Sequence, residues 1–508
     1  MKNHNLIKIF SLSLLLAIGA CTDLEVTEKD SLVIETEGGS FSGIDPTAGL
    51  TTAYADLRGF SVENNVFALS EVTSDELLVP TRGTDWGDNG IWRTLHQHTW
   101  DPSHQYVLDS WNNLNSNIFR LNQLLAPESN ATAEQAAEGK FLRAFNMFFV
   151  LDLFRQVPFR GVNEGVDVAP QILTPQEAFD LIITDLTEAL EILPPGVPNS
   201  NESNFKASKA SANLLLAKLY LNKHVYLGGE PDAADMTKVI QHVDAIKADG
   251  YTLHNGYFDI FKSTPDNETI LWTDGSVGNR IWYGLHYNQQ TPDNTGGGWN
   301  GFSTTADFYA LFEGDPDSNE PGNNQEERRG FVPTSMIGYG FLVGQQYNNG
   351  EALTDRAGNP LVFTKEFPGL VGNNERTGIR IIKYHPTENP GGSFVTHYIL
   401  LRYADAHLMK VEASLRGGTS SEDALTLFNE LRTIRGASPF TAVTLDDVLD
   451  ERGRELYIEG WRRNDQVRFG TFTSTWPMKE NTEEHRVIFP IPANALSSNP
   501  NLVQNPGY

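Results

Sequence analysis

The 508-residue chain has one cysteine and comparatively few basic residues. A single thiol, at Cys21, allows neither an internal disulfide nor a zinc site built from several cysteines. Lysine and arginine total 38 against 65 aspartates and glutamates, which gives a formal net charge of −27 at pH 7. An excess of negative charge on this scale argues against nucleic acid and polyanions as ligands. We therefore expect no nucleic-acid partner and favour a neutral ligand.

The sequence also lacks the common catalytic motifs. It contains no Gly-x-Ser-x-Gly nucleophile elbow and no His-Glu-x-x-His zinc motif. Its carboxylates are too numerous for a glycosidase pair to be identified from sequence alone. We therefore expect a protein that is not an enzyme and has no cofactor.

Two sets of residues have the composition of a metal site. Three histidines lie close together at His96, His98 and His104. A second set follows the spacing of a calcium-binding loop but has Glu320 where that loop requires glycine; its members are Asp315, Asp317, Asn319 and Glu326. We interpret both sets as structural and expect no bound metal.

The N-terminus has the pattern of an export signal. Lys2 and Lys8 precede an apolar segment at 9–17 that is too short to span a bilayer, and Ile18-Gly19-Ala20-Cys21 resembles a lipobox. An ordinary secretory signal with a chance cysteine is the alternative, but the absence of any other cysteine disfavours it. We expect residues 1–20 to be a lipoprotein signal peptide, Cys21 to be lipidated, and residues 21–43 to form a polar tether.

Helical periodicity dominates both ends of the remaining chain. The pattern predicts helices over 45–59, 103–125, 132–155, 174–193, 207–224, 236–247, 398–416, 421–435 and 444–460. Between them, glycine, asparagine and proline accumulate and no helical period persists. This division predicts an N-terminal helical region at 44–250, a loop-rich insert lobe at 251–396, and a C-terminal helical region with a tail at 397–508. Paired helices are typical of tetratricopeptide units, although no strict 34-residue repeat is present.

Two glycine-rich loops carry aromatic and polar side chains suited to a sugar. An indole covers the apolar face of a sugar ring, while carboxylate, amide and guanidinium groups bind its hydroxyls. In 80–92, Trp86 follows Asp85 between glycines, and in 296–301 three glycines precede Trp299. A further aromatic cluster comprises Trp282, Tyr283 and Tyr287. By contrast, we expect three other tryptophans to be core residues: Trp92, Trp100 and Trp111.

Several ordered segments resemble the RagB/SusD family. They are AEGKFLRA (137–144), LTPQEAFDLIITDLTEALEILP (173–194), LRYADAHLMKVEA (401–413), ERGRELYIEGWRRNDQVRFG (451–470) and IPANALSSNPNLVQNPGY (491–508). The matches span nearly all of the chain beyond the signal peptide, and the last two are the most specific. The resemblance implies a mostly α fold, namely a tetratricopeptide-like helical superhelix with a loop-rich insert lobe.

The same resemblance implies function, location and partners. It implies a surface-exposed lipoprotein of the outer membrane that captures glycans and acts as the lid of a SusC-like TonB-dependent transporter. The ligand-binding residues that we carry over are Arg82, Asp85, Trp86, Trp299, Asn300 and Arg380. A peptide-binding or other nutrient-binding relative, or a tethered glycoside hydrolase, remains an alternative.

Charged residues recur at helical spacing near the C-terminus. They are Glu451, Arg452, Glu455, Glu459 and Arg462. Side chains three or four residues apart on a helix are neighbours. We therefore predict a structural ion-pair network on the last long helix, without a catalytic role.

Overall fold

The computed structural model describes residues 41–165, 168–262, 264–273, 284–290, 297–317, 319–320, 322, 324–385 and 398–508. The predicted signal peptide, Cys21, nearly all of the predicted tether, Trp282 and Tyr283 lie outside these residues. Residues from Gly43 to the C-terminus form one unit, which contains all of the helices and strands named below.

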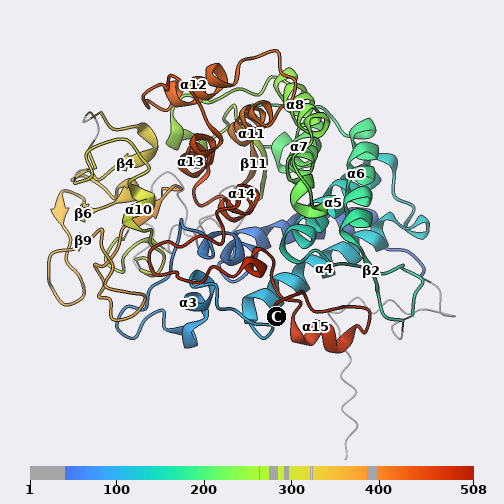
Figure 1. Cartoon of the computed structure of the whole chain (residues 1–508), viewed down its shortest axis with the longest axis horizontal. Helices are drawn as coiled ribbons and strands as arrows, with labels where there is room; N and C mark the ends of the chain where they lie inside the picture. The colour runs from blue at the N-terminus through green and yellow to red at the C-terminus, as the bar shows by residue number, and fades with distance from the viewer. Residues whose placement is uncertain are drawn as a thin grey trace, which may run out of the picture. The chain divides into compact units, whose positions relative to one another are not determined.

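Helices dominate the first half of the unit (Figure 1). They are α2 (Pro46–Asp56), α3 (Ile91–His96), α4 (Gln105–Leu125), α5 (Ala133–Phe154), α6 (Pro175–Ile192), α7 (Lys209–Leu227) and α8 (Ala233–Ala248). From α4 to α8, each helix packs on the next one along the chain. The capping boxes that open α5 and α6 are both formed, with Thr132 bonded reciprocally to Gln135 and Thr174 to Glu177. The predicted starts of α5 and α6 are therefore confirmed.

The C-terminal helices pack back onto this array. They are α11 (Tyr403–Leu415), α12 (Ala424–Ile434), α13 (Leu445–Leu456), α14 (Arg462–Arg468) and α15 (Ala493–Ser498). Helix α11 contacts both α7 and α8, while α12 and α13 contact α11. Figure 1 shows α11, α13 and α14 beside the α5–α8 array. The predicted mostly helical fold is thus confirmed.

Two of the predicted helices were wrong in their bounds. The segment 398–416 begins as strand β11 (Tyr398–Arg402), which pairs antiparallel with β3 (Thr269–Thr273) before α11 starts. A short buried apolar run does not distinguish a strand from a helix. The helix predicted over 444–460 ends at Leu456, because Tyr457 has a non-helical ψ of 141° and Ile458 then has a left-handed backbone (φ 54°).

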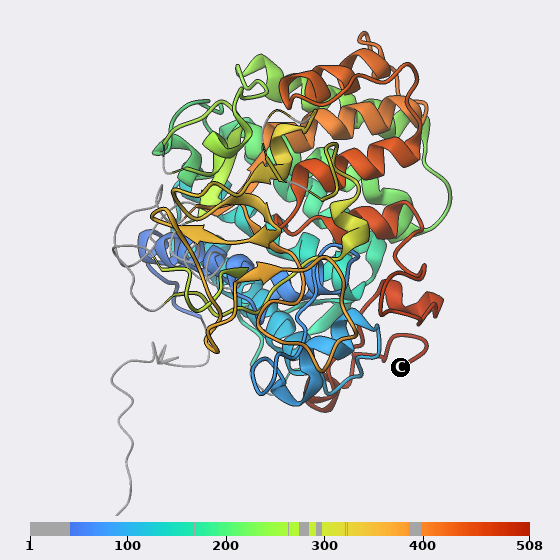
Figure 2. The ribbon, with the colours of Figure 1, turned by 90° about the vertical axis from the view of Figure 1, so that its left-hand side faces the viewer.

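Between α8 and α11 the chain forms short strands and loops. The strands are β4 (Gly330–Phe331), β5 (Tyr339–Leu342), β6 (Gly344–Gln345), β7 (Tyr347–Asn348), β8 (Glu351–Ala352), β9 (Val362–Phe363) and β10 (Arg380–Ile382). Antiparallel pairing joins β10, β5 and β4 in one small sheet and forms the pairs β6–β9 and β7–β8. The short helix α10 (Ala306–Tyr309) also belongs to this region. Figure 2 faces this side of the unit and shows the strands in front of the helices.

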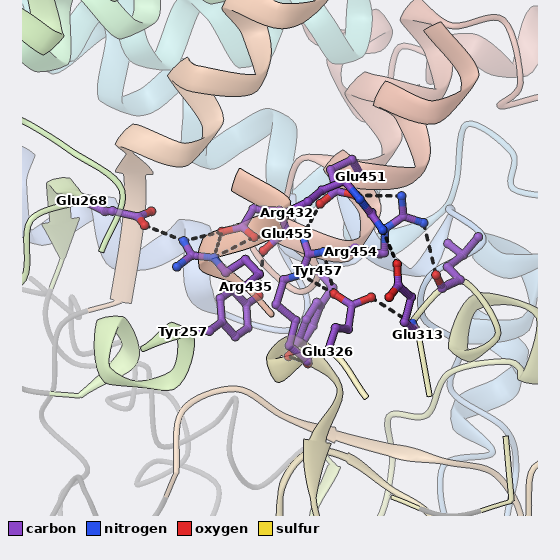
Figure 3. Close-up of polar contacts among 12 residues, drawn as sticks. Tyr257, Glu268, Glu313, Glu326, Arg432, Arg435, Glu451, Arg454, Glu455 and Tyr457 are labelled. Carbon is purple, nitrogen blue, oxygen red and sulfur yellow. Dashed lines mark hydrogen bonds and ion pairs between the residues drawn. The ribbon is translucent and has the colours of Figure 1, made fainter. Parts of the chain in front are cut away.

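A buried ionic network fixes the loop region to the C-terminal helices (Figure 3). The Glu455 carboxylate forms ion pairs with Arg402 (2.7 Å), Arg435 (2.9 Å) and Arg328 (3.1 Å). One turn earlier, Glu451 pairs with the same Arg328 nitrogen, Nη1, and with Arg432 and Arg454. Burial would raise the pKa of Glu455, but its three arginines hold that pKa well below its usual range.

The predicted ionic network is confirmed, although not on one helix. Glu451, Arg452 and Glu455 lie on α13, Glu459 follows that helix, and Arg462 opens α14. Arg462 pairs with Asp75 at 2.8 Å, and Glu459 pairs with Arg402 at 2.7 Å. The network therefore joins distant segments instead of lining one helix face.

Candidate functional site

The first predicted loop is a tight turn fixed at both ends. Arg82 and Asp85 exchange two backbone hydrogen bonds of 2.9 Å, with Gly83 in the left-handed region at φ 59°. The Gly83 amide donates to the Asn373 carbonyl at 3.0 Å. Asp85 and Trp86 are thereby held in place at the end of this turn.

Three of the predicted ligand-binding residues lie beneath the surface. Arg82, Asn300 and Arg380 are each at most 3% exposed. Arg82 Nε donates to the Asn300 carbonyl (2.9 Å), and Arg380 Nη2 donates to Asn300 Oδ1 (2.8 Å). Both guanidinium groups also donate to Ser303 Oγ. Their polar atoms thus hold the two loops together, and ligand contact by these three residues stays a prediction that their burial does not support.

The two buried arginines have no carboxylate partner in the part of the chain that the structure describes. Backbone carbonyls, including that of Thr377, accept from both. Burial lowers the pKa of Arg82 to about 9, and burial together with the nearby Arg82 lowers the pKa of Arg380 well below its ordinary value. Neutral acceptors therefore take the place of a counter-ion here.

Trp86 is half-buried and rests on a glycine. A Cβ at Gly301 would lie 2.4 Å from the Trp86 ring, so only glycine allows the indole to lie there. Trp86 Nε1 donates to the Trp299 carbonyl at 2.7 Å. The indole also packs against Phe302 and Trp92, with ring centroids 5.9 Å away in each case. Trp86 consequently joins the two predicted loops.

Trp299 is held outward by the backbone before it. Cβ atoms at Gly297 and Gly298 would lie 1.7 Å from the Tyr287 carbonyl oxygen and 2.0 Å from that of Leu285. The glycines therefore let this segment run directly alongside 285–287, where Asn300 N donates to the Leu285 carbonyl at 2.8 Å. With 43% of its surface exposed, Trp299 is the only strongly exposed aromatic residue in the described chain.

A row of polar side chains surrounds Asp85. Tyr287 Oη donates to Asp85 Oδ2 at 2.6 Å, and Arg356 Nη2 donates to the same oxygen at 2.7 Å. Arg356 Nε donates to Glu375 Oε1 at 2.5 Å, and the guanidinium lies 3.9 Å above the Tyr287 ring. The hydrogen bond from Tyr287, joined by the pair with Arg356, lowers the pKa of Asp85. These contacts keep the Asp85 carboxylate ionised and oriented.

His286 supports this row from below. It is fully buried, and burial lowers its pKa to about 4, so the ring is neutral at pH 7. Nδ1 accepts from the Asn288 amide at 3.1 Å, which leaves Nε2 to donate to Glu375 Oε2 at 3.0 Å. Burial raises the pKa of Glu375, but hydrogen bonds from Arg356 and His286 outweigh this effect and lower it overall.

We refer to Asp85, Trp86, Tyr287, Trp299 and Arg356 together as the Trp299 surface. It combines an exposed indole with a carboxylate, a guanidinium and a phenol whose positions are fixed by mutual hydrogen bonds. An apolar ring face beside oriented polar groups suits a polyhydroxylated ligand. A cavity of about 600 Å³ lies elsewhere, around Phe258 and Tyr339, but none of the predicted ligand-binding residues lines it.

Arg356 and Glu375 could not be identified as site residues from the sequence. Asp85 and Arg356 are separated by 271 positions, and no local motif connects them. Tyr287 belonged to a predicted aromatic cluster, but its bond to Asp85 could not be inferred. The only local signal for Arg356 was its position in a polar turn, and arginine is common in such turns whether or not they bind a ligand.

The remaining predictions concern packing and metals. Trp92, Trp100 and Trp111 are all at most 5% exposed, so their assignment to the core is confirmed.

The ring nitrogens of His96 and His98 bond the backbone carbonyls of Pro477 and Thr73. No group of three or more potential metal ligands occurs within the described residues. None of the described helices has the length and apolar character needed to cross a bilayer.

Comparison with known proteins gave consistent matches along the chain. A model described as the SusD family matches residues 267–508, and one described as starch-binding associating with outer membrane matches residues 39–221. The starch-binding protein SusD of Bacteroides thetaiotaomicron is 26% identical over the full length of both chains. SusD-like protein P38 of Formosa agariphila is also 26% identical, covering 80% of this chain and 81% of its own.

Solved structures have the same fold. A laminarin-binding SusD-like protein superposes with a TM-score of 0.69 at 22% identity, covering 91% of this chain and 99% of its own. Surface glycan-binding protein A from Bacteroides thetaiotaomicron, in complex with laminarihexaose, superposes with a TM-score of 0.68 at 19% identity, covering 91% and 98%.

Proposed function

This chain belongs to the SusD family, and from that premise we propose that it captures a neutral oligosaccharide on the Trp299 surface. Its relatives are binding proteins and not enzymes, and we assign this chain binding without catalysis. The observation that carries the proposal is the exposed indole of Trp299, whose backbone carbonyl is bound by Trp86, the residue that follows the fixed Asp85 carboxylate.

The arrangement suggests how a sugar would bind. One ring of the oligosaccharide stacks on Trp299, while hydroxyls at its edge donate to Asp85 and accept from Arg356. Trp86 supports the platform from below through its bond to the Trp299 carbonyl. Because the polar groups already hold one another, little side-chain freedom is lost on binding, which favours affinity.

The charges of the site favour a neutral ligand. Asp85 and Glu375 contribute two carboxylates and Arg356 one guanidinium, while His286 is neutral. An acidic sugar would be repelled by this net negative charge and by the net charge of −27 of the whole chain. The names of relatives that bind starch or laminarin, which are neutral glucans, support this choice.

We extend the proposal to location and partner. Lipidation at Cys21 would anchor the protein to the outer membrane, and the family description, starch-binding associating with outer membrane, supports that location. There the protein would act as a lid on a SusC-like TonB-dependent transporter. A tether keeps the local concentration of the lid high at the transporter.

Replacing the exposed indole tests the site. We expect Trp299→Ala to weaken binding of maltohexaose or laminarihexaose by roughly tenfold to a hundredfold, by analogy with other aromatic stacking platforms. The melting temperature should not change, because the side chain is exposed. Isothermal titration calorimetry gives the affinity, with Val371→Ala as a control at an exposed position outside the surface. Unchanged affinity in Trp299→Ala would reject this surface as the site.

A further inference from the structure

A second groove lies away from the Trp299 surface, between α4, β1 (Val157–Phe159) and α15. It has a volume of about 430 Å³ and is continuous with a neighbouring pocket of about 270 Å³, because both are lined by Asn112, Asn115, Pro158, Arg160 and Pro170. In Figure 1, α15 lies below α4, near strand β2 (Gln171–Leu173). None of the predicted ligand-binding residues takes part in it.

Amide side chains dominate the polar lining of the groove. On α4, Asn112, Asn115 and Asn122 recur at intervals of three and seven residues and therefore share one helix face. Asn494 and Asn499 face them from the α15 side. The described lining residues include no aspartate or glutamate, and Arg160 is the only charged residue among them. A groove without carboxylates is unusual on a chain with a net charge of −27.

Two polar atoms in the groove lack a partner. Asn115 donates through Nδ2 to the Trp111 carbonyl at 2.8 Å, but its Oδ1 accepts no hydrogen bond from the described residues. Arg160 donates to the Val168 carbonyl, while its Nε has no acceptor there. Polar groups withdrawn from water normally have partners. Both atoms are shielded from solvent, so this unused acceptor and unused donor would serve a ligand with both functions when the two side chains turn toward the groove.

The geometry points to a second binding site for a neutral oligosaccharide in this groove. Sugar hydroxyls donate to amide oxygens and accept from amide and guanidinium N–H groups, and the faces of Pro158 and Pro170 provide apolar contact for ring C–H groups. An extended peptide is disfavoured, since β1 has only three residues and its central Pro158 lacks the N–H that pairing with an added strand requires. The ligand class rests on the proposed function, but the site does not depend on the Trp299 surface.

A label in the groove tests the proposal directly. Since Cys21 is the only cysteine, Ser116→Cys in a Cys21→Ser chain accepts a single environment-sensitive dye on the groove wall. We expect maltohexaose or laminarihexaose to change the fluorescence, and the double substitution Asn112→Leu with Asn115→Leu to weaken this response by roughly tenfold or more. Asn113→Leu, on the exposed side of the same helix, is the matched control and should have no effect. Asn115→Asp, which keeps the side-chain shape, should also weaken the response if the leucine variant does not fold.

The outcomes separate this site from the proposed function. Trp299→Ala should leave the dye response within twofold of wild type. A chain that binds glycan through Trp299 but gives no dye response overturns the groove proposal, as does a response to a peptide mixture alone. Binding that survives Trp299→Ala and disappears with the groove substitutions would support the groove and refute the Trp299 surface. Absence of binding to both oligosaccharides at both places would overturn both proposals.

Discussion

At the scale of single residues, the decisive feature is how glycine controls two tryptophans. Gly297 and Gly298 allow the backbone to approach 285–287 and turn Trp299 outward. Gly301 provides the bare backbone on which Trp86 lies. The sequence context of Trp86 had suggested an independent stacking platform. The structure gives this indole a second, supporting role. It is a half-buried support, and its removal should lower both stability and binding.

The role of Gly301 leads to a prediction. Gly301→Ala places a methyl group within 2.4 Å of the Trp86 ring and should displace the indole from the Trp299 carbonyl. Because the displaced indole no longer supports Trp299, we expect at least a tenfold loss of affinity for the oligosaccharide, which is about 1.4 kcal/mol of binding free energy. The helical circular dichroism spectrum should be retained. Gly369→Ala is the control, since its Cβ would meet no atom closer than 3.9 Å. Equal affinity in the two variants would show that Trp86 has no supporting role.

At the scale of elements, α13 is the central connection of the unit. Its Glu451 and Glu455 carboxylates, both buried, receive arginines from the loop region, from β11 and from α12. Local sequence set the start of this helix, where Thr444 and Asp447 form a capping box. Its function as a connection depends on partners more than 100 positions away, such as Arg328.

Removing one carboxylate from this network should be costly. Glu455→Gln leaves Arg402, Arg435 and Arg328 with one fewer negative charge inside the protein. Breaking a buried ion pair typically costs about 3–5 kcal/mol, so we expect a loss of this order in the free energy of unfolding, measured in urea. Glu191→Gln, on the exposed surface of α6, should change it by less than about 0.5 kcal/mol. A loss no larger than that of the control would contradict the structural role.

At the scale of the whole molecule, buried ionisable groups should make stability depend on pH. Burial lowers the pKa of His98 to about 2 and that of His242 to about 4. For Glu412, burial is outweighed by Arg468 and Arg416, which lower its pKa to about 2. In each case the unfolded chain binds a proton at a higher pH than the folded chain does. Stability therefore falls as pH falls.

The histidines should act first as pH decreases. Below about pH 6.5 the unfolded chain protonates His98 while the folded chain does not, so this residue should lower the free energy of unfolding by about 1.4 kcal/mol per pH unit. The carboxylates add to the loss below about pH 4.5, their ordinary pKa. Urea denaturation between about pH 8 and pH 4 measures how steeply the free energy of unfolding changes with pH. His98→Phe should reduce this slope by about 1.4 kcal/mol per pH unit, which corresponds to one proton. An unchanged slope in that variant would show that His98 does not cause the effect.

The proposed anchor also concerns the whole molecule. We expect Cys21→Ala to give soluble or unprocessed protein, because it removes the only thiol available for lipid attachment. Cell fractionation with a labelled fatty acid measures this, with Ser116→Cys as a control that retains Cys21. Persistent label on the alanine variant would refute the lipoprotein assignment.

Local sequence was enough to locate the long helices α4 to α7, the capping boxes of α5 and α6, and the family. Helical periodicity and capping boxes act within one or two turns, so α4, α5, α6 and α7 could be located without tertiary information. It also marked the two loops that carry Trp86 and Trp299, because glycine beside aromatic and acidic residues is a local pattern. Segment matches along the whole chain identified the family from the same local information.

Which of the loop residues reach the surface depends on contacts between segments that are distant in the sequence. Arg82, Asn300 and Arg380 look like ligand-binding residues in the sequence, but each is buried by contacts with segments up to 295 positions away. Arg356 likewise joins the Trp299 surface only through contacts that are distant in the sequence, namely its bonds to Asp85 and Glu375. Burial and the pairing of charges depend on which segments meet in space, and the periodicity of a single segment carries no information about that.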